Sequence, residues 1–340
     1  MLGRLHGRLT RTSGIRFAAT GQDPGGCSPA LSNYSLGWGT GSGAASARRG
    51  RVLGIVSDAV RMGHFAGVDI GALTCDVVIL DETRRVAASE IVLTGARART
   101  ATQLALNSAL AKAGVSGEQL GALVATGYGR EGVAGRTRSV TEITCHARGA
   151  FHLFPHTRLV LDVGGQDCKA IALDGGGRVI DFAMNDKCAA GTGRFFEMMA
   201  HALEVDLDDF GALALQASKR VRISSVCTVF AESEVVSLVA EGEPVENILA
   251  GLCRAAAERV SKLAQQVGPA AQAAGLLPST ALGTGRSPRR HVALTGGVAK
   301  NVGFRSALEE LLGVKVEVPE EPQLVGALGA ALLAASGDGV

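Results

Sequence analysis

The sequence has seven cysteines but no CxxC pair, and their spacing is neither even nor dense. That pattern excludes a disulfide framework and predicts a reducing, cytoplasmic setting. No apolar stretch runs uninterrupted for the length that a membrane crossing needs, so no membrane partner is expected. Aromatic residues make up only 4% of the 340 positions, whereas hydrophobic residues make up 46%. A chain of this length can bury a large core, and its many Ala and Gly residues indicate closely packed helices and tight turns.

The formal net charge is only +2, and it is unevenly distributed. Residues 1–62 contain eight arginines against Asp23 and Asp58, which leaves 26 basic and 30 acidic residues for the rest. The body is therefore mildly acidic, and no nucleic-acid partner is expected. The leader of residues 1–62 resembles an organellar transit peptide in composition, but a mis-chosen start codon, with Met62 as the real initiator, is the favoured interpretation. In either case we expect these residues to be poorly ordered.

Two segments of the chain repeat one pattern. VDIGALTCDVVILD, which begins at Val68, aligns without gaps with LDVGGQDCKAIALD, which begins at Leu161. Each reads as an apolar strand, a glycine turn and a second strand. This internal duplication predicts an α/β fold with two related lobes that face each other across a cleft, residues 63–157 and 158–340. Residues 268–290, rich in Ala, Gly, Pro and Ser, are expected to form a mobile surface loop.

Both repeats place an Asp two residues before a Gly, at the turn of a strand pair. Such a turn lets backbone N–H groups approach phosphate oxygens while the carboxylate holds hydrated Mg²⁺. One turn of this kind is weak evidence, but two at equivalent positions, with a later TGG turn and a small-residue helix, predict a site for a nucleoside triphosphate. We expect Asp69 and Asp162 to position Mg²⁺ and phosphate, and Gln166 to orient the attacking water. The residues expected to bind the nucleotide are Gly71, Thr74, Gly164, Gly165, Lys169, Thr295, Gly296, Gly297 and Gly326.

Two cysteines stand out because each is placed near the start of a predicted helix, Cys188 in NDKCAAGTGRFF and Cys227 in SSVCTVFAESEV. A helix N-terminus stabilises a thiolate and any anion attached to it. Small buried cysteines are the ordinary alternative. An iron–sulfur cluster usually takes four thiolates, so two per chain predict a cluster shared across a two-fold axis between two copies. That inference holds only if none of the other cysteines completes a set within one chain.

These motifs together resemble a known family. VDIG, ATGYGR, TEITCHARGA, DVGGQD, NDKCAAGTGRF, SSVCTVFAESEV, TGGVAKN and GALGAA are similar to the activator component of 2-hydroxyacyl-CoA dehydratases, within the BadF/BadG/BcrA/BcrD ATPase family. The resemblance covers nearly all of residues 66–335 and implies duplicated ribonuclease H-like lobes of the acetate kinase, sugar kinase, Hsp70 and actin fold. It also implies a homodimer with one 4Fe-4S cluster, held by Cys188 and Cys227 of each chain.

The activity that this resemblance implies is ATP-driven transfer of one electron. The acceptor would be a partner enzyme that dehydrates a 2-hydroxyacyl-CoA or reduces an aromatic acyl-CoA, with a ferredoxin or flavodoxin as the electron donor. ATP, Mg²⁺ and the cluster are the implied cofactors. The sequence does not separate a dehydratase activator from an aromatic reductase subunit. It also leaves open a small-molecule kinase of the same fold and a redox sensor that binds nucleotide without turning it over.

The chain departs from the family pattern at the first phosphate turn. Relatives typically read DxGSTxxK there, whereas this chain lacks the two hydroxyls after Gly71 and carries Asp76 at the place of the base. ATP affinity or turnover is therefore expected to differ, although Lys169 holds the equivalent place in the second repeat and Thr74 offers one hydroxyl. In TEITCHARGA, His146 follows Cys145, and a helix-packing role is favoured for it over a metal or acid–base role.

Overall fold

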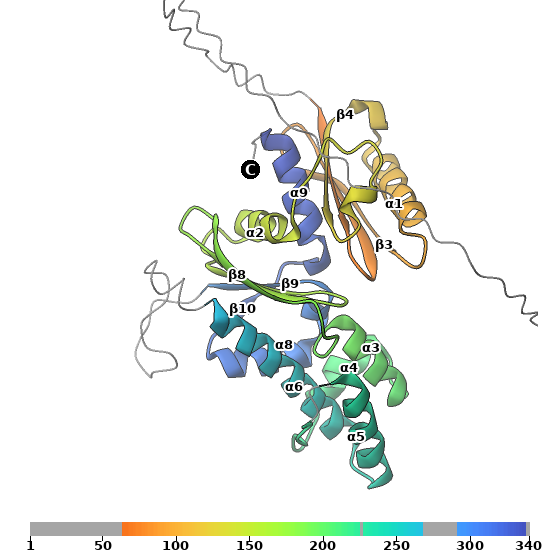
Figure 1. Ribbon diagram of the computed structural model, residues 1–340, viewed down its shortest axis with the longest axis vertical. Helices are drawn as coiled ribbons and strands as arrows, with labels where there is room; N and C mark the ends of the chain where they lie inside the picture. The colour runs from red at the N-terminus through yellow and green to blue at the C-terminus, as the bar shows by residue number, and fades with distance from the viewer. Residues whose placement is uncertain (1–62, 225–226, 268–290, 338–340) are drawn as a thin grey trace, which may run out of the picture. The chain divides into compact units, whose positions relative to one another are not determined.

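The computed structural model describes residues 63–224, 227–267 and 291–337, which all belong to one compact unit (Figure 1). The expected leader of residues 1–62 and the expected loop of residues 268–290 lie outside these described residues. None of the helices in the described part of the chain combines the length and the apolar character that a membrane crossing requires.

The first sheet has the strand order β3-β2-β1-β4-β5. Its strands are β1 (His64–Ile70), β2 (Thr74–Leu80), β3 (Val86–Leu93), β4 (Leu120–Gly127) and β5 (Arg138–Ser139). The first three form an antiparallel meander, while β4 and β5 run parallel to their neighbours. Nearly every residue of β1 and β2 is buried, as expected for strands that are covered on both faces.

The second sheet has the order β10-β9-β6-β7-β8, which is the same topology read from its other edge. Its strands are β6 (Leu159–Val163), β7 (Cys168–Leu173), β8 (Val179–Asn185), β9 (Val292–Thr295) and β10 (Val316–Glu317). Again three antiparallel strands are followed by two parallel ones. The predicted α/β fold with duplicated lobes is therefore confirmed.

Helices cover both faces of each sheet. On the first sheet, α1 (Ala98–Ala113) packs on one face and α9 (Val325–Ser336) on the other. On the second sheet, one face is covered by α2 (Glu142–Leu153) and the other by a group of helices. That group consists of α3 (Gly193–Ala202), α4 (Leu207–Ala214), α5 (Thr228–Ala240), α6 (Val245–Gln266) and α8 (Val302–Leu312).

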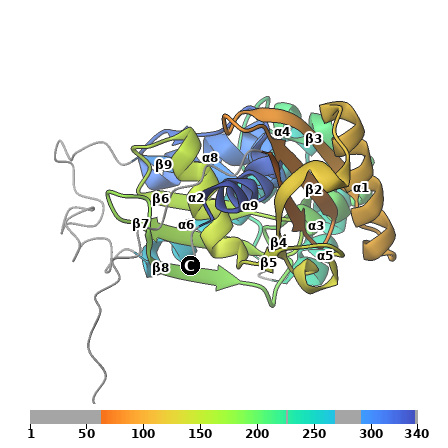
Figure 2. The same cartoon turned by 90° about the horizontal axis from the view of Figure 1, so that it is seen from above.

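Two of these helices cover the sheet opposite to the one that chain order suggests. From the sequence, α2 was predicted to belong to the first lobe (residues 63–157) and α9 to the second (residues 158–340). In the structure, α9 packs against β1 and β4 of the first sheet, whereas α2 packs against the second sheet (Figure 2). Small residues allow α2 and α9 to lie against each other. A Cβ atom added to Gly329 would lie 1.8 Å from the carbonyl oxygen of Cys145, and one added to Gly149 would lie 2.2 Å from that of Val325. The two lobes are therefore joined through a close helix crossing.

The two cysteine segments lead into α3 and α5, which contact each other. Cys227 is the N-cap of α5, at the start of the helix as its sequence suggested. Cys188 precedes Thr192, the N-cap of α3, so a short turn separates it from the helix. Thr192 closes this turn, because its backbone N–H and its hydroxyl both donate to the carbonyl of Ala189, at 3.0 and 2.6 Å.

Candidate nucleotide-binding site

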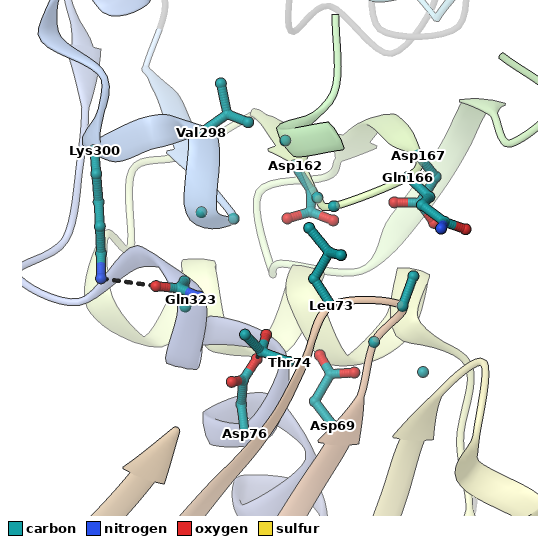
Figure 3. Close-up of a pocket in the computed structure, with 18 of the residues that line it drawn as sticks. Asp69, Leu73, Thr74, Asp76, Asp162, Gln166, Asp167, Val298, Lys300 and Gln323 are labelled. Carbon is teal, nitrogen blue, oxygen red and sulfur yellow. Dashed lines mark hydrogen bonds between the residues drawn. The ribbon is translucent and has the colours of Figure 1, made fainter. Parts of the chain in front are cut away.

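A cavity of about 360 Å³ is lined by residues of both lobes, including the two predicted phosphate turns. Figure 3 shows Asp69 and Asp76 on the side of the first lobe, and Asp162 with Gln166 and Asp167 on the side of the second. The two turns have the same internal geometry. The N–H of Gly71 donates to the carbonyl of Thr74 at 2.9 Å, and the N–H of Gly164 donates to that of Asp167 at 3.0 Å. The duplication therefore extends to the hydrogen bonds of the turns.

Each of the two aspartates at the strand ends is packed against a glycine with positive φ. Asp69 lies beside Gly127, which has φ 81° at the end of β4, and Asp162 lies beside Gly296, which has φ 83° just after β9. A Cβ atom at these glycines would lie 2.4 Å from Oδ1 of Asp69 and 2.9 Å from Oδ1 of Asp162. Each position therefore requires glycine for two reasons: the backbone has a positive φ, and a side chain would collide with the aspartate.

The second lobe surrounds its aspartate with charged and hydrogen-bonding partners. Lys169 Nζ lies 3.3 Å from Oδ2 of Asp162 and 2.7 Å from Oδ1 of Asp167, and the hydroxyl of Thr295 donates to Oδ1 of Asp162 at 3.0 Å. Burial alone would raise the pKa of Asp162, but the charges of His146 and Lys169 outweigh it and the pKa is lowered. Burial would likewise lower the pKa of Lys169, but Asp162 and Asp167 outweigh it and hold the pKa above its usual range. Both groups are thus kept charged in a buried site.

His146 connects the two lobes. Its Nε2 atom lies 3.6 Å from Oδ2 of Asp69, its Nδ1 atom lies 3.4 Å from Oδ1 of Asp162, and the ring is almost fully buried. Burial opposes its protonation, yet the two carboxylates raise its pKa above the ordinary value. The helix-packing role favoured from the sequence is incomplete, because the side chain lies between the two central aspartates. The sequence feature that could have indicated this role is a histidine among the otherwise small, apolar residues on the buried face of α2.

Most of the predicted nucleotide residues line the cavity, but two stand behind it. Thr295 is fully buried and acts on Asp162 by its hydrogen bond. Gly326, in the first turn of α9, gives Asp69 room, since a Cβ atom there would lie 2.0 Å from Oδ2 of that residue. The predicted residues that line the cavity are Asp69, Gly71, Thr74, Asp162, Gly164, Gly165, Gln166, Lys169, Gly296 and Gly297.

The donor set of this cavity fits Mg²⁺, which is usually held by one or two carboxylates together with water and substrate phosphates. Asp69 and Asp162 supply carboxylates from both sides, and Lys300 contributes an ammonium group that contacts Glu321 and Gln323. The backbone of each glycine turn faces the same space. The cavity therefore has the parts that a triphosphate with its metal requires.

The two cysteines predicted to bind iron lie outside this cavity. Cys188 lines a second cavity of about 900 Å³ with Ser224, which is three residues ahead of Cys227. Cys188 is half-buried and Cys227 is exposed. Four guanidinium or ammonium groups line the same cavity, from Arg222, Arg254, Arg259 and Lys262. Basic residues and helix N-termini suit an anionic group bound to thiolates, so the residues present fit an iron–sulfur cluster.

Within one chain, the described residues do not gather a complete metal site: no three His, Cys, Asp or Glu side chains are placed to hold one ion. The cysteines at positions 75, 145, 168 and 253 are buried, and burial raises the pKa of each thiol. Cys168 also lines the second cavity, where its thiol contacts the carbonyl of Gly191 at 3.8 Å. Cys188 and Cys227 are thus the two more accessible thiols of the described chain.

Hydrogen bonds connect the second phosphate turn directly to the helix behind Cys188. The N–H of Gly193 donates to the carbonyl of Gly164, and the N–H of Arg194 donates to that of Gly165, both at 2.9 Å. These are N–H groups of the first turn of α3, which have no partner within the helix itself. A change in the position of the phosphate turn must therefore move α3 or break these bonds.

Comparison with known proteins decides the family. The model of the BadF/BadG/BcrA/BcrD ATPase family matches residues 66–334. The chain belongs to the BadF/BadG/BcrA/BcrD ATPase family. The 2-hydroxyisocaproyl-CoA dehydratase activator of Clostridioides difficile is 40% identical over 268 residues, which are 79% of this chain and 93% of the relative. The (R)-2-hydroxyglutaryl-CoA dehydratase activating ATPase of Acidaminococcus fermentans is 40% identical over 269 residues, 79% of this chain and 95% of the relative.

A solved structure is similar to this chain over both lobes. The activator of the 2-hydroxyisocaproyl-CoA dehydratase from Clostridium difficile, solved with bound ADPNP, superposes with a TM-score of 0.71 at 39% identity. The match covers 81% of this chain and 95% of that one. The resemblance seen in the sequence motifs is therefore confirmed over both lobes of the fold.

Proposed function

We propose that this protein is an ATP-dependent one-electron donor that activates a 2-hydroxyacyl-CoA dehydratase. It would act as a homodimer in which Cys188 and Cys227 of each chain hold one shared 4Fe-4S cluster. When bound, that cluster would supply the low-potential electron, accepted first from a ferredoxin or flavodoxin. The reducing setting expected from the cysteine usage suits a cytoplasmic location.

The observation that carries this proposal is the pair of hydrogen bonds from α3 to the phosphate turn. Gly193 and Arg194 donate to Gly164 and Gly165, while the turn that holds Cys188 lies immediately before the same helix. Movement of the second lobe on binding or loss of the γ-phosphate would thus be transmitted to the thiolate of Cys188. Nucleotide-driven closure of two lobes is a common form of such a switch.

At the nucleotide, we assign the roles to residues that line the first cavity. Asp69 and Asp162 position the metal and the phosphates, and Lys169 balances the charge of Asp162. Gln166, at the tip of the second turn, orients the attacking water, a role that glutamine has in other phosphate-cleaving sites. Gly296 and Gly297, which line the cavity with Val298 and Gln323, would receive the adenosine.

The sequence left three alternatives open, and specific observations bear on two of them. A subunit of an aromatic acyl-CoA reductase would use the same machinery, but the relatives at 40% identity are dehydratase activators, which favours the first function. A small-molecule kinase would share the fold and the nucleotide cavity, yet it gives no role to the accessible thiols of Cys188 and Cys227.

The test is anaerobic purification followed by determination of iron, sulfide and mass. The parent protein is expected to be brown and dimeric, with one four-iron cluster for every two chains. Cys188→Ala and Cys227→Ala should each lose the iron, whereas the control Cys253→Ala, which alters a buried thiol of the core, should retain it. Iron-free parent protein, or variants that keep their iron, would refute the proposal.

A further inference from the structure

The two lobes differ in charge at one pair of equivalent positions. In the second lobe, Asp162 of β6 is paired in register with Lys169 of β7, and the ammonium group contacts the carboxylate. In the first lobe, Asp69 of β1 is paired in register with Asp76 of β2. The same backbone frame thus places a carboxylate and an ammonium group together in one lobe, and two carboxylates together in the other.

Asp76 is buried without the partners that a buried carboxylate needs. It is 6% exposed, it lines the nucleotide cavity, and its Oδ2 atom accepts a hydrogen bond from the hydroxyl of Thr74 at 3.2 Å (Figure 3). Its Oδ1 atom is buried, and no described residue donates a hydrogen bond to it. A buried oxygen of this kind is costly unless something pairs with it.

The surroundings of Asp76 do not supply the missing positive charge. The ionisable groups that act on it are Asp69 and Glu321, which are acidic, and His146, which is shared with Asp162. Among the described residues that line the cavity there are seven carboxylates against two ammonium groups. Arg130 and Arg194 offset two of these acids from outside the cavity, and Lys300 is itself paired with Glu321. Among the described residues, the two adjacent carboxylates of the first lobe therefore have one basic neighbour, His146, which they share with Asp162.

We propose that Asp69 and Asp76 hold a divalent metal cation in the first lobe, which takes the place that the ammonium group of Lys169 has in the second. The carboxylate oxygens and the Thr74 hydroxyl suit a hard cation such as Mg²⁺ or Mn²⁺, whose remaining ligands would be water. The site binds its cation before nucleotide arrives and makes an acid-rich cavity able to accept a triphosphate. This inference extends the proposed function and rests on its nucleotide site. Its test measures metal binding in the absence of nucleotide, iron and partner protein.

In the competing explanation, Asp76 carries a proton and the site holds no cation. Burial and repulsion by Asp69 raise the pKa of Asp76 to about 8, so a proton can replace the cation near neutral pH. Cation and proton therefore compete for the same oxygen. A direct measurement of metal binding at a pH above the pKa of Asp76 distinguishes the two explanations.

The experiment is titration of the nucleotide-free protein with Mn²⁺ at pH 8.5, about half a unit above the pKa of Asp76, with free Mn²⁺ read from its EPR signal. The parent is expected to bind one Mn²⁺ that Mg²⁺ displaces. Asp76→Asn and Asp69→Asn should each weaken this binding about tenfold or more, and Asp76→Lys, which recreates the pairing of the second lobe, should abolish it. The control Glu82→Gln changes an exposed acid on the turn between β2 and β3 and should bind as the parent does.

Circular dichroism of each variant shows whether it is folded before its binding is compared. Folded parent protein that binds no Mn²⁺ would overturn the proposal in favour of a shared proton. Equal binding by the parent and by folded Asp76→Lys would overturn it as well, because the cation would then be held elsewhere. Iron content does not enter these results, so a failure of the electron-transfer proposal would leave them unchanged.

Discussion

The two lobes share one backbone design but support their central aspartates differently. Around Asp162, a lysine, a threonine and a histidine contact the carboxylate, so its position and charge are fixed before any ligand binds. Around Asp69, the neighbour in the equivalent position is another acid, and His146 is the basic group in contact. Duplication has therefore preserved the strand order and the turns, while the side chains have diverged into a half in which Asp162 is paired with Lys169 and a half in which Asp69 faces Asp76.

The largest expected effect is on ATP hydrolysis when the half that contains Asp162 is altered. Asp162→Asn should lower kcat about 10²–10³-fold, because a preorganised carboxylate that positions the metal and the phosphates is lost. Asp69→Asn should instead act mainly by raising the Mg²⁺ concentration that gives half of the maximal rate. Steady-state ATPase assays over a range of Mg²⁺ separate the two effects. Equal Mg²⁺ dependence in both variants would contradict the proposed difference between the two lobes.

A second test removes the ammonium group from the second lobe. Lys169→Gln leaves Asp162 and Asp167 buried without their cation, and it should lower the free energy of unfolding by about 3–5 kcal/mol. Lys112→Gln is the matched control, because Lys112 forms an exposed pair with Glu90 and should cost less than about 1 kcal/mol. Chemical denaturation measures both. Similar losses in the two variants would show that the buried network does not stabilise the fold.

A third test asks whether the backbone frame is truly equivalent in the two lobes. Gly127→Ala and Gly296→Ala should each cost about 1–3 kcal/mol, since both glycines have positive φ and lie against an aspartate. Gly117→Ala serves as control, because a Cβ atom there meets nothing within 4 Å. A large loss at one of the two positions with none at the other would contradict equivalence. Thermal or denaturant unfolding gives the comparison.

The last test concerns the pH dependence of stability in the presence of EDTA. Asp76 has its pKa raised from 3.8 to about 8, so the folded protein holds a proton that the unfolded chain has released. The free energy of unfolding should therefore fall as pH rises between these values, by at most about 1.4 kcal/mol per pH unit. Asp76→Asn should remove this slope. An unchanged slope in that variant would assign the dependence to another group.

Local patterns were sufficient to predict the duplicated strand pairs and the phosphate turns. Those features follow from apolar periodicity and glycine placement within a few residues. The pattern along the chain could not show that α9 covers the first sheet, because that choice depends on packing between segments far apart in sequence. For the same reason it missed the place of His146 between the two aspartates and the supporting roles of Thr295 and Gly326.

In the proposed function, adenine nucleotide in the cavity between the lobes controls a metal centre held by Cys188 and Cys227. The most direct measurement is the EPR spectrum and midpoint potential of the anaerobically purified, dithionite-reduced protein with ADP and with ATP. We expect an iron–sulfur signal that is absent in Cys188→Ala, and a midpoint potential that differs between the two nucleotides. A signal and potential that are the same with either nucleotide, or the absence of any signal in the parent, would contradict it.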